Sequence, residues 1–489
     1  MSSANRVQMC AVLEATLGTT PVTPRMRAVR FTGEALEFKP DFIDSDEIRA
    51  DRMLGDPIKV MQASLGSISG ELSYPVDNTP MSTTLQSALC AAWANMPSRD
   101  NDGTADSVIT DVNAGTQVVT CTTGAAFVTS QLVRFSGFGS ASNNGTFKCT
   151  TGSATVPAFV GSGLVVDATP AAAARMKVVG FVGVAGDITA TASGLASTAL
   201  NFTTLGLSVG QWVKVGGTAA GDQFATSANN NYARITAIAA AALTLDNLPT
   251  GWAVDAGAAK TIKVWVGDVI KNGVTVYGHT FEKGFLDQTV PSYLVYKGEV
   301  VNTMDFNLAS RQKVTWTCSY MGMGGSSGTV ALDAAIDAAT TNQVMAGNAN
   351  VGRLAEAGVI LAAPNWGKEF SVQVNNNLRA IEALDSTSPV DIQVGDCTVT
   401  GKLNAYFGDL SLLTKFYAGT PSALNSRVFK NNQAIIFDVP RATYRGGGNP
   451  AVSGKNTDVM VPLDYQASYD SVTGAHLLIN RMEYLEATN

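Results

Sequence analysis

The middle of the chain contains two copies of one sequence pattern, and this repetition limits what the chain can fold into. One copy begins QLVRFSG at Gln131, and the other begins QWVKVGG at Gln211. An Asn-Asn pair, an L-x-x-D-x-x-P block and a closing K-V strand follow in the same order in both copies. Short alternating strands between Gly and Asn turns are typical of β structure. We therefore expect two small, related all-β modules, in residues 98–186 and 187–267.

A second and weaker repetition surrounds these modules. The stretch ISGELSY before the modules resembles VTGKLNAY near the C-terminus, so that Gly70 corresponds to Gly401. A helix is predicted after each stretch, near Pro80–Trp93 and near Leu410–Tyr417, because apolar residues recur there at helical spacing. A pair of strand patterns then follows each helix in the order of the chain. The order strand, loop, strand, helix, strand, strand therefore occurs twice.

Together the two repetitions predict a mainly β fold with two tandem units, each with a flanking α-helix, and two inserted all-β modules. The first unit is expected in residues 1–97 and 268–345, and the second in residues 346–489. The modules interrupt the first unit between its helix and the strands that follow. The glycine cluster MGMGGSSG (321–328) is predicted to be a flexible hinge between the units.

The chain is poor in charge, and what charge it has is acidic. Charged residues make up 15% of the chain and its formal net charge is −7. The chain as a whole therefore lacks the cationic surface with which proteins grip nucleic acid, although a local basic patch stays open. The densest basic cluster, Arg25, Arg27 and Arg30, alternates with apolar residues. We interpret it as a strand with one solvated or interfacial face.

The residues that usually carry chemistry are few and scattered. The two histidines, His279 and His476, lie in no catalytic or metal-binding motif, and we expect both to be structural. The stretch Asp100–Asp106 resembles part of a calcium loop but lacks the terminal Glu. The sequence therefore predicts no enzyme, no cofactor and no catalytic, cofactor-binding or metal-binding residue.

The cysteine spacing and the apolar runs indicate where the protein is made. No C-x-x-C pair occurs, which argues against a zinc site or a disulfide framework and favours buried free thiols in a reducing cytoplasm. The most apolar internal stretch, residues 235–245, is bounded by Arg234 and Asp246 and is shorter than the roughly 20 residues that span a bilayer. The N-terminal apolar run is interrupted by Glu14 and does not resemble a signal peptide. We expect no contact with a membrane.

Several stretches resemble the major tail tube proteins of long-tailed, siphovirus-type bacteriophages. The resemblance covers residues 20–96 and 275–489 and leaves out the middle modules. The stretches that carry it are 23–52 (TPRMRAVRFTGEALEFKPDFIDSDEIRADR), 67–74 (SISGELSY), 279–285 (HTFEKGF), 296–322 (YKGEVVNTMDFNLASRQKVTWTCSYMG), 372–383 (VQVNNNLRAIEA), 399–420 (VTGKLNAYFGDLSLLTKFYAGT) and 459–474 (VMVPLDYQASYDSVTG).

The resemblance implies that each of the two tandem units is a tail-tube-type β-sandwich with a flanking α-helix, whose inner strands join neighbouring subunits into a β-barrel around a channel. The chain would be a virion protein made in the host bacterial cytoplasm. Stacked rings would form the tail tube through which genome DNA is ejected. The partners would be copies of the chain in the same ring and in stacked rings. In the lumen the tape measure protein and DNA would pass without sequence-specific binding.

Further expectations follow if each chain carries two tube units. Three chains would then close a trimeric ring of pseudo-sixfold symmetry, with a hexamer as the alternative. The polar stretch Ile43–Asp56 would be an arm that reaches an adjacent ring, and acidic residues on alternate strand positions would line the lumen. The modules would decorate the outside of a sheathless tube.

Two other kinds of protein stay open from the sequence. A host-surface-binding virion protein, an adhesin or receptor-binding protein, would account for the Thr-, Ser- and Asn-rich modules but not for two embedded strand–helix–strand units. A polysaccharide-degrading enzyme would need paired carboxylates in an aromatic cleft, and no cluster of Trp with acidic residues occurs in the sequence.

Overall fold

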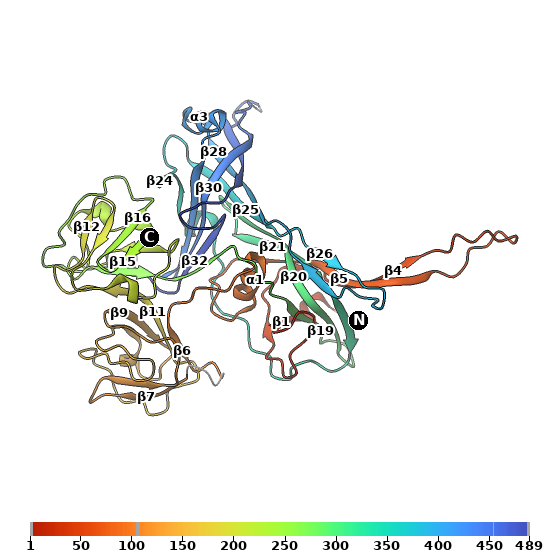
Figure 1. Cartoon of the computed structure of the whole chain (residues 1–489), viewed down its shortest axis with the longest axis horizontal. Helices are drawn as coiled ribbons and strands as arrows, with labels where there is room; N and C mark the ends of the chain where they lie inside the picture. The colour runs from red at the N-terminus through yellow and green to blue at the C-terminus, as the bar shows by residue number, and fades with distance from the viewer. Residues whose placement is uncertain (1–2, 104–107, 453, 487–489) are drawn as a thin grey trace.

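A computed structural model describes residues 3–103, 108–452 and 454–486 (Figure 1). The chain is mainly β, as predicted, and forms a strand-rich main body with a second body on one side. The main body extends on the opposite side into a long two-stranded arm. The second body is built from residues between β6 and β17, which are coloured orange to yellow-green in Figure 1.

One antiparallel sheet runs through the whole main body. Its strands pair in the order β4, β5, β21, β20, β25, β28, β31, β30. Their bounds are β4 Glu37–Ile43, β5 Ile58–Glu71, β20 Ser292–Ala309, β21 Thr315–Gly322, β25 Gly367–Asn375, β28 Thr398–Tyr406, β30 Gln433–Gly447 and β31 Met460–Ala467. The pairing of β20 with β25 joins the first half of the chain to the second.

The predicted duplication is visible in how the strands pair. In the first half β5 pairs with β21, β21 with β20, β20 with both β22 and β19, and β19 with β1. In the second half β28 pairs with β31, β31 with β30, β30 with both β32 and β29, and β29 with β23. The two series correspond strand by strand. The bounds are β1 Val7–Leu13, β19 His279–Phe285, β22 Gly324–Gly328, β23 Val351–Glu356, β29 Ser422–Lys430 and β32 Leu478–Met482. Gly70 and Gly401 occupy equivalent positions, as the sequence predicted, because each lies opposite an aromatic residue, Trp316 or Tyr465.

The other elements of the main body are short. They are η1 Ala4–Arg6, β2 Arg27–Ala28, β3 Gly33–Glu34, β18 Asp268–Lys271, α2 Gly347–Asn350, β24 Val359–Ile360, β26 Arg379–Ile381 and β27 Asp391–Gln393. The glycine cluster at 321–328 is not a hinge, because β22 within it pairs with β20 along residues 293–297. Backbone hydrogen bonds to a neighbouring strand thus hold a segment whose composition suggested flexibility.

Each half carries the predicted helix. The first, α1, spans Pro80–Leu89 and is shorter than predicted, because Cys90 adopts a left-handed conformation (φ 50°) that ends it. The second, α3, spans Ser411–Ala418 and ends at Gly419, also left-handed (φ 60°). The predicted helices are therefore confirmed, with their ends moved by a few residues.

One hydrophobic cluster fills the interior of both units. It contains Ile68 and Phe306 from the first unit and Phe370 and Phe437 from the second. The rings of Phe306 and Phe437 lie 4.8 Å apart between centroids. Burial of large aromatic side chains is among the strongest contributions to a core, so the two units stabilise each other.

The inserted segment has one core, and its strands form one ten-stranded sheet and a separate hairpin of β7 and β8. Its strands are β6 Ser98–Asp100, β7 Ile109–Asn113, β8 Val118–Cys121, β9 Gln131–Ser136, β10 Gly145–Lys148, β11 Arg175–Val182, β12 Thr189–Thr191, β13 Gly194–Ala196, β14 Trp212–Val215, β15 Tyr232–Ala239, β16 Ala242–Asp246 and β17 Lys263–Val266, with turns η2 Ala141–Asn143, η3 Phe202–Thr204 and η4 Ser227–Asn229. The closing strands of the two copies, β11 and β17, pair with each other. A single hydrophobic cluster extends from Ile109 to Val266.

Matching hydrogen bonds support the repeat between the two copies. The Asn143 side chain bonds the backbone of Val165 in both directions, and the Asn229 side chain does the same with Ala253. The side chain of the next residue does the same in each copy: Asn144 bonds the backbone N–H and C=O of Phe138, and Asn230 bonds those of Phe224.

The third block of the repeat was aligned wrongly from the sequence. The L-x-x-D-x-x-P pattern equates Asp167 with Asp246, but the residue equivalent to Asp167 is Asp255. Asp167 bridges to Val112, and Asp255 bridges to Ala190, in the first strand of each copy. The better match is GLVVDA (163–168) with GWAVDA (251–256). The shared bonds from Asn143 to Val165 and from Asn229 to Ala253 support this alignment.

The second body is joined to the main body by a buried network of ion pairs. Lys177 of β11 lies 2.5 Å from Asp268, and the Arg481 guanidinium of β32 lies 2.9 Å from the same carboxylate. Asp77, before α1, also accepts from Lys177 and Arg481, and Arg175 pairs with Glu483. A neighbouring apolar cluster, with Trp212 and Trp265 packed near Ile436 and Met482, closes the same junction.

A second buried polar cluster lies where β1, β19 and β20 meet. Glu299 is fully buried and accepts a hydrogen bond from the Ser64 hydroxyl. Glu14 accepts from the Gly298 amide at 2.9 Å and from the Thr280 hydroxyl at 2.7 Å. Burial raises the pKa of Glu299 to about 8, with the nearby Glu14 as a smaller cause.

The buried ion pairs between the two bodies lead to a prediction for the stability of the chain. Asp268→Ala removes the carboxylate shared by Lys177 and Arg481 and leaves two buried cations less compensated. Loss of one partner of a buried pair typically costs about 3–5 kcal/mol. Urea unfolding of the unassembled chain should show a loss of this size. Asp51→Ala is the control, because its pair with Arg49 is exposed on the arm, and an equal loss in both variants would contradict the prediction.

The raised pKa of Glu299 predicts how stability changes with pH. Between its ordinary value of 4.5 and about 8, the unfolded chain releases a proton that the folded chain retains. The contribution of Glu299 to the free energy of unfolding should therefore fall as pH rises, by about 1.4 kcal/mol per pH unit, and level off above pH 8. Glu299→Gln should remove this slope, so that its stability relative to the parent increases from pH 5 to pH 8. Parallel stability curves for the two proteins would contradict the assignment.

Candidate functional site

One face of the main sheet is covered by the hydrophobic core, and the other is open and polar. The alternation is plain in β21, where Trp316, Cys318 and Tyr320 are buried while Thr315 and Thr317 are exposed. We call the open side the polar face. It is formed by Ser67, Ser69, Glu71, Thr303, Asp305, Asn307, Thr315, Thr317, Ser319, Glu369, Ser371, Gln373, Asn375, Thr398, Thr400, Lys402, Asn404, Thr443, Arg445, Asp464 and Gln466.

Side chains on the polar face bond to one another across the strands. The Thr303 and Ser319 hydroxyls lie 2.6 Å apart, and the Ser69 and Thr317 hydroxyls 3.1 Å apart. The Gln373 amide donates to Asp305 at 2.7 Å, across the boundary between the two units. Cross-strand hydroxyl and amide pairs of this kind stabilise a sheet by a few tenths of a kcal/mol to about 1 kcal/mol each. Six side chains of the polar face are therefore bonded to one another.

The polar face carries few charges. Hydroxyl and amide side chains take most of its positions, and the acids Glu71, Asp305, Glu369 and Asp464 are accompanied by Lys402 and Arg445. A shallow depression of about 530 Å³ lies over the second unit and is lined by both signs of charge. The expectation that acidic residues line a lumen stays a prediction.

The sheet has two edges that the chain itself leaves open. At one edge, the amides of Thr32 and Ala35 bond inward to β5, at Ser69 and Ser67. At the other edge, β30 pairs with β31 along residues 442–447. Within the described part of the chain, no strand pairs with the outer side of residues 30–34 or of residues 443–447. Open strand edges of this kind readily pair with another chain.

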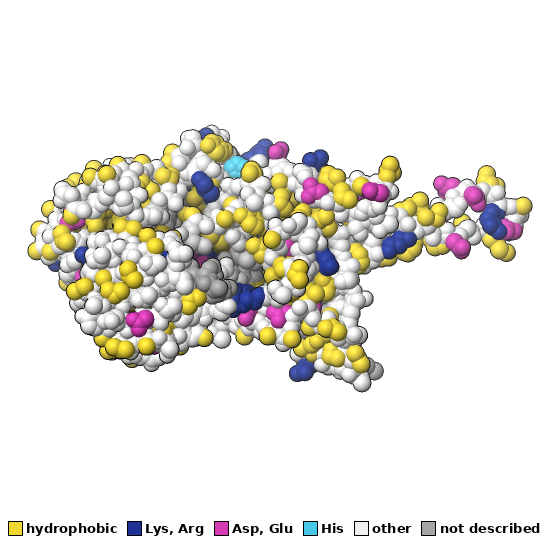
Figure 2. All heavy atoms as spheres, turned by 60° about the horizontal axis from the view of Figure 1, so that its bottom comes forward, with side chains coloured by type: hydrophobic (Ala, Val, Ile, Leu, Met, Phe, Trp, Pro, Cys, Tyr) yellow, Lys and Arg dark blue, Asp and Glu magenta, His cyan; other side chains and the backbone are white. Residues whose placement is uncertain are grey.

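The arm, residues 39–63, lies beyond the part of β5 that pairs with β21, projects far from the rest of the molecule and has little to pack against. Its tip carries exposed apolar side chains, Ile48, Met53 and Leu54, among acidic and basic residues. Figure 2 shows hydrophobic and charged side chains mixed along it. The predicted arm at Ile43–Asp56 is confirmed as a projecting hairpin tip. Its exposed apolar surface is typical of a segment that is covered in an assembly.

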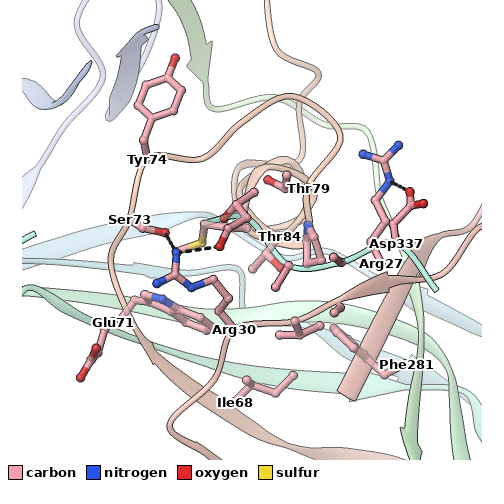
Figure 3. Close-up of a pocket in the computed structure, with 18 of the residues that line it drawn as sticks. Arg27, Arg30, Ile68, Glu71, Ser73, Tyr74, Thr79, Thr84, Phe281 and Asp337 are labelled. Carbon is pink, nitrogen blue, oxygen red and sulfur yellow. Dashed lines mark hydrogen bonds and ion pairs between the residues drawn. The ribbon is translucent and has the colours of Figure 1, made fainter. Parts of the chain in front are cut away.

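A cavity of about 620 Å³ lies between α1 and the segment at residues 27–30 (Figure 3). Its charged side chains are already engaged: Arg27 pairs with Asp337 at 3.4 Å, and Arg30 donates to Ser73 and to the backbone of Thr340 and Asn342. Arg25 pairs with Asp337 at 2.7 Å. Arg25 and Arg27 are thus paired with an acid inside the chain, whereas Arg30 is held by neutral oxygen acceptors.

The other residues singled out from the sequence do not converge on a site. His279 begins β19, stacks on Phe281 and is fully buried, which lowers the pKa of its imidazole to about 4. His476 lies in the turn before β32, far along the chain from His279. Asp100 belongs to β6 and pairs with Arg175, whereas Asp106 lies outside the described residues. In the described ranges no three His, Cys, Asp or Glu residues gather as metal ligands would.

The six cysteines are free thiols, and burial raises the pKa of each, as expected for thiols inside a fold. Five are buried and Cys397 is half-buried. They are Cys10, Cys90, Cys121, Cys149, Cys318 and Cys397.

Sequence reasoning missed the residues of the polar face, although their signal was present. The run TWTCSYMG (315–322) alternates hydroxyl-bearing and apolar side chains with the period of a strand. That pattern identifies an exposed face. It does not identify which exposed face is continued by a second unit, because this depends on the pairing of β20 with β25.

Comparison with known proteins gives one family. A family model described as phage tail tube protein matches residues 174–467, more than half of the chain. The match includes the second inserted module, which the resemblance had left out, and does not reach residues 20–96, which it had included. No curated protein matches the sequence.

No helix in the described part of the chain is long and apolar enough to cross a membrane. The matched family is one of virion components that assemble with copies of themselves into a tube. On the strength of the match from β11 to β31, the chain belongs to the phage tail tube protein family.

Proposed function

We propose that the chain forms closed rings that stack into the tail tube of a siphovirus-type phage and surround the channel for genome ejection. The observation that carries this proposal is the continuous main sheet with its two open edges. Pairing of one edge with the opposite edge of the next copy would continue the sheet around a ring. A closed ring leaves no strand edge exposed, which removes the risk of uncontrolled edge-to-edge association.

Three chains are the proposed content of one ring. The two units of a chain are joined by strand pairing between β20 and β25, and their other pairings are equivalent. Copies joined in the same way would place six similar units in a ring of three chains, with pseudo-sixfold symmetry. The alternative is a ring of six chains.

The polar face is proposed to line the channel. Several of its hydroxyl and amide groups bond to each other, and its few charges are of both signs. Such a wall suits a channel in which DNA and the tape measure protein move without specific binding. The second body, with the modules at 98–186 and 187–267, would then lie on the outside of the tube. No enzymatic step is part of this function.

The arm is proposed to connect stacked rings. Its apolar tip residues lie far from the core that they would need to pack against in their own chain. An adjacent ring would supply that surface. The mixed charges at the tip would favour one orientation over others.

Microscopy and mass measurement test the ring. Negative-stain images of purified protein should show rings or hollow tubes, and the mass of one ring should equal three chains of 50.9 kDa. Six chains per ring would overturn the trimer while leaving the tube intact. Persistent monomers that bind host cells would overturn the proposed function and favour an adhesin.

Substitutions in the arm test the stacking of rings. Ile48→Asp with Leu54→Asp places charges on two exposed tip residues, and we expect rings of unchanged mass but tubes much shorter than those of the parent. Val184→Asp, at an exposed valine of the second body, is the matched control and should leave tube length unchanged. Full-length tubes from the arm variant would refute the role of the arm.

A further inference from the structure

The contact between the two units inside one chain shows how two such units pair. Across this contact, Asp305 of β20 lies opposite Gln373 of β25, and Phe306 lies opposite Val372. The pairing is antiparallel, and the Gln373 amide bonds the Asp305 carboxylate on the polar face. We call this contact the internal junction.

The end of β30 is equivalent to the part of β20 that enters the internal junction. Phe306 lies opposite Trp316 in β21, and Tyr444 lies opposite Tyr465 in β31. Trp316 and Tyr465 are themselves equivalent, because each lies opposite the corresponding glycine of the next strand. Tyr444 therefore takes the place of Phe306, and its neighbour Thr443 takes the place of Asp305.

The segment at residues 30–34, which contains β3, is equivalent to β25. Gln373 lies opposite Thr400, one residue before Gly401. Gly33 lies opposite Ser69, one residue before Gly70. Because Gly401 and Gly70 are equivalent, Gly33 takes the place of Gln373.

From these equivalences we infer the register of the junction between neighbouring copies: residues 443–447 of one copy pair antiparallel with residues 30–33 of the next, with Thr443 opposite Gly33. This inference rests on the proposed ring. It goes further because it names the two surfaces and their alignment, and because a shift by one residue would turn every side chain to the other face.

The local structure at both edges suits this pairing. An added Cβ at Gly33 would meet no atom within 4 Å, so a side chain can be placed on the polar side at this position without a clash. Gly446 and Gly447 end β30 without bulky side chains. Both edges face the polar side with Thr443 and Gly33, so the pairing would extend the polar face from one copy to the next.

Cysteine cross-linking tests the register. Opposite residues in an antiparallel pair have Cα atoms about 4.5–5.5 Å apart, within the range that a disulfide bridges. Assembled Thr443→Cys/Gly33→Cys protein, under mild oxidation by air, should form disulfides between chains, seen as covalent multimers on a non-reducing gel. The background should be low because five of the native cysteines are buried and the sixth is half-buried.

Two further variants control the geometry. Gln466→Cys/Gly33→Cys places the first cysteine one strand farther from the junction, since Gln466 lies opposite Thr443 in β31. The Cα atoms would then be roughly 10 Å apart, too far for a disulfide. Asp305→Cys/Gln373→Cys repeats the geometry at the internal junction and should form a disulfide within one chain, which shows that oxidation worked.

The outcomes separate the register from the proposed function. If tubes form and the internal control oxidises, but the Thr443/Gly33 pair does not link, or links no better than the Gln466/Gly33 pair, the register is wrong and the ring stands. If the unmodified chain forms no rings at all, both proposals fail. Amide hydrogen exchange of the unmodified chain gives a second readout: assembly should protect residues 30–33 and 443–447, and unchanged exchange at either edge would overturn the register.

Discussion

The pairing of β20 with β25 is the contact on which the rest of the molecule depends. It turns two similar sandwiches into one continuous sheet, with a shared core on one side and the polar face on the other. Because backbone hydrogen bonds are directional, this pairing also fixes how each unit presents its remaining edge. The chain therefore ends its sheet with one open edge from each unit, and the proposed assembly follows from repeating a contact that the chain already makes.

Buried charge holds the second body in place. Lys177, Asp268 and Arg481 come from three distant parts of the chain and are inaccessible to solvent. Such a network contributes less net stability than apolar packing of the same volume, but its geometry tolerates little displacement. The inserted segment is thus attached by a defined contact and not by a loose linker. A projection on the outside of a tube would in this way move together with the wall.

Sequence reasoning reached most of the architecture because it relied on repetition and period. The doubled strand–helix–strand order, the equivalence of Gly70 with Gly401 and the inserted repeat all follow from local patterns that packing preserved. The errors have physical causes. The glycines at 321–328 suggested a hinge, but the pairing of β22 with β20 orders them. The sequence matched Asp167 to Asp246, but equivalent backbone bridges show that Asp167 corresponds to Asp255. The acidic lumen expected from the net charge stays a prediction, since net charge does not say on which face a charge lies.

By itself the sequence determined the β class, the duplication, the projecting polar arm and the resemblance to tail tube proteins, since period, turn residues and motif order are properties of the chain. The tertiary structure decided which face is open, which edges have no partner in the described chain and how the inserted segment is attached. The two open edges, at Thr443 and Gly33, and the two sides of the ion-pair network, at Lys177 and Asp268, lie far apart along the chain. Their positions relative to one another are set by the pairing of strands, and no local sequence pattern encodes that pairing.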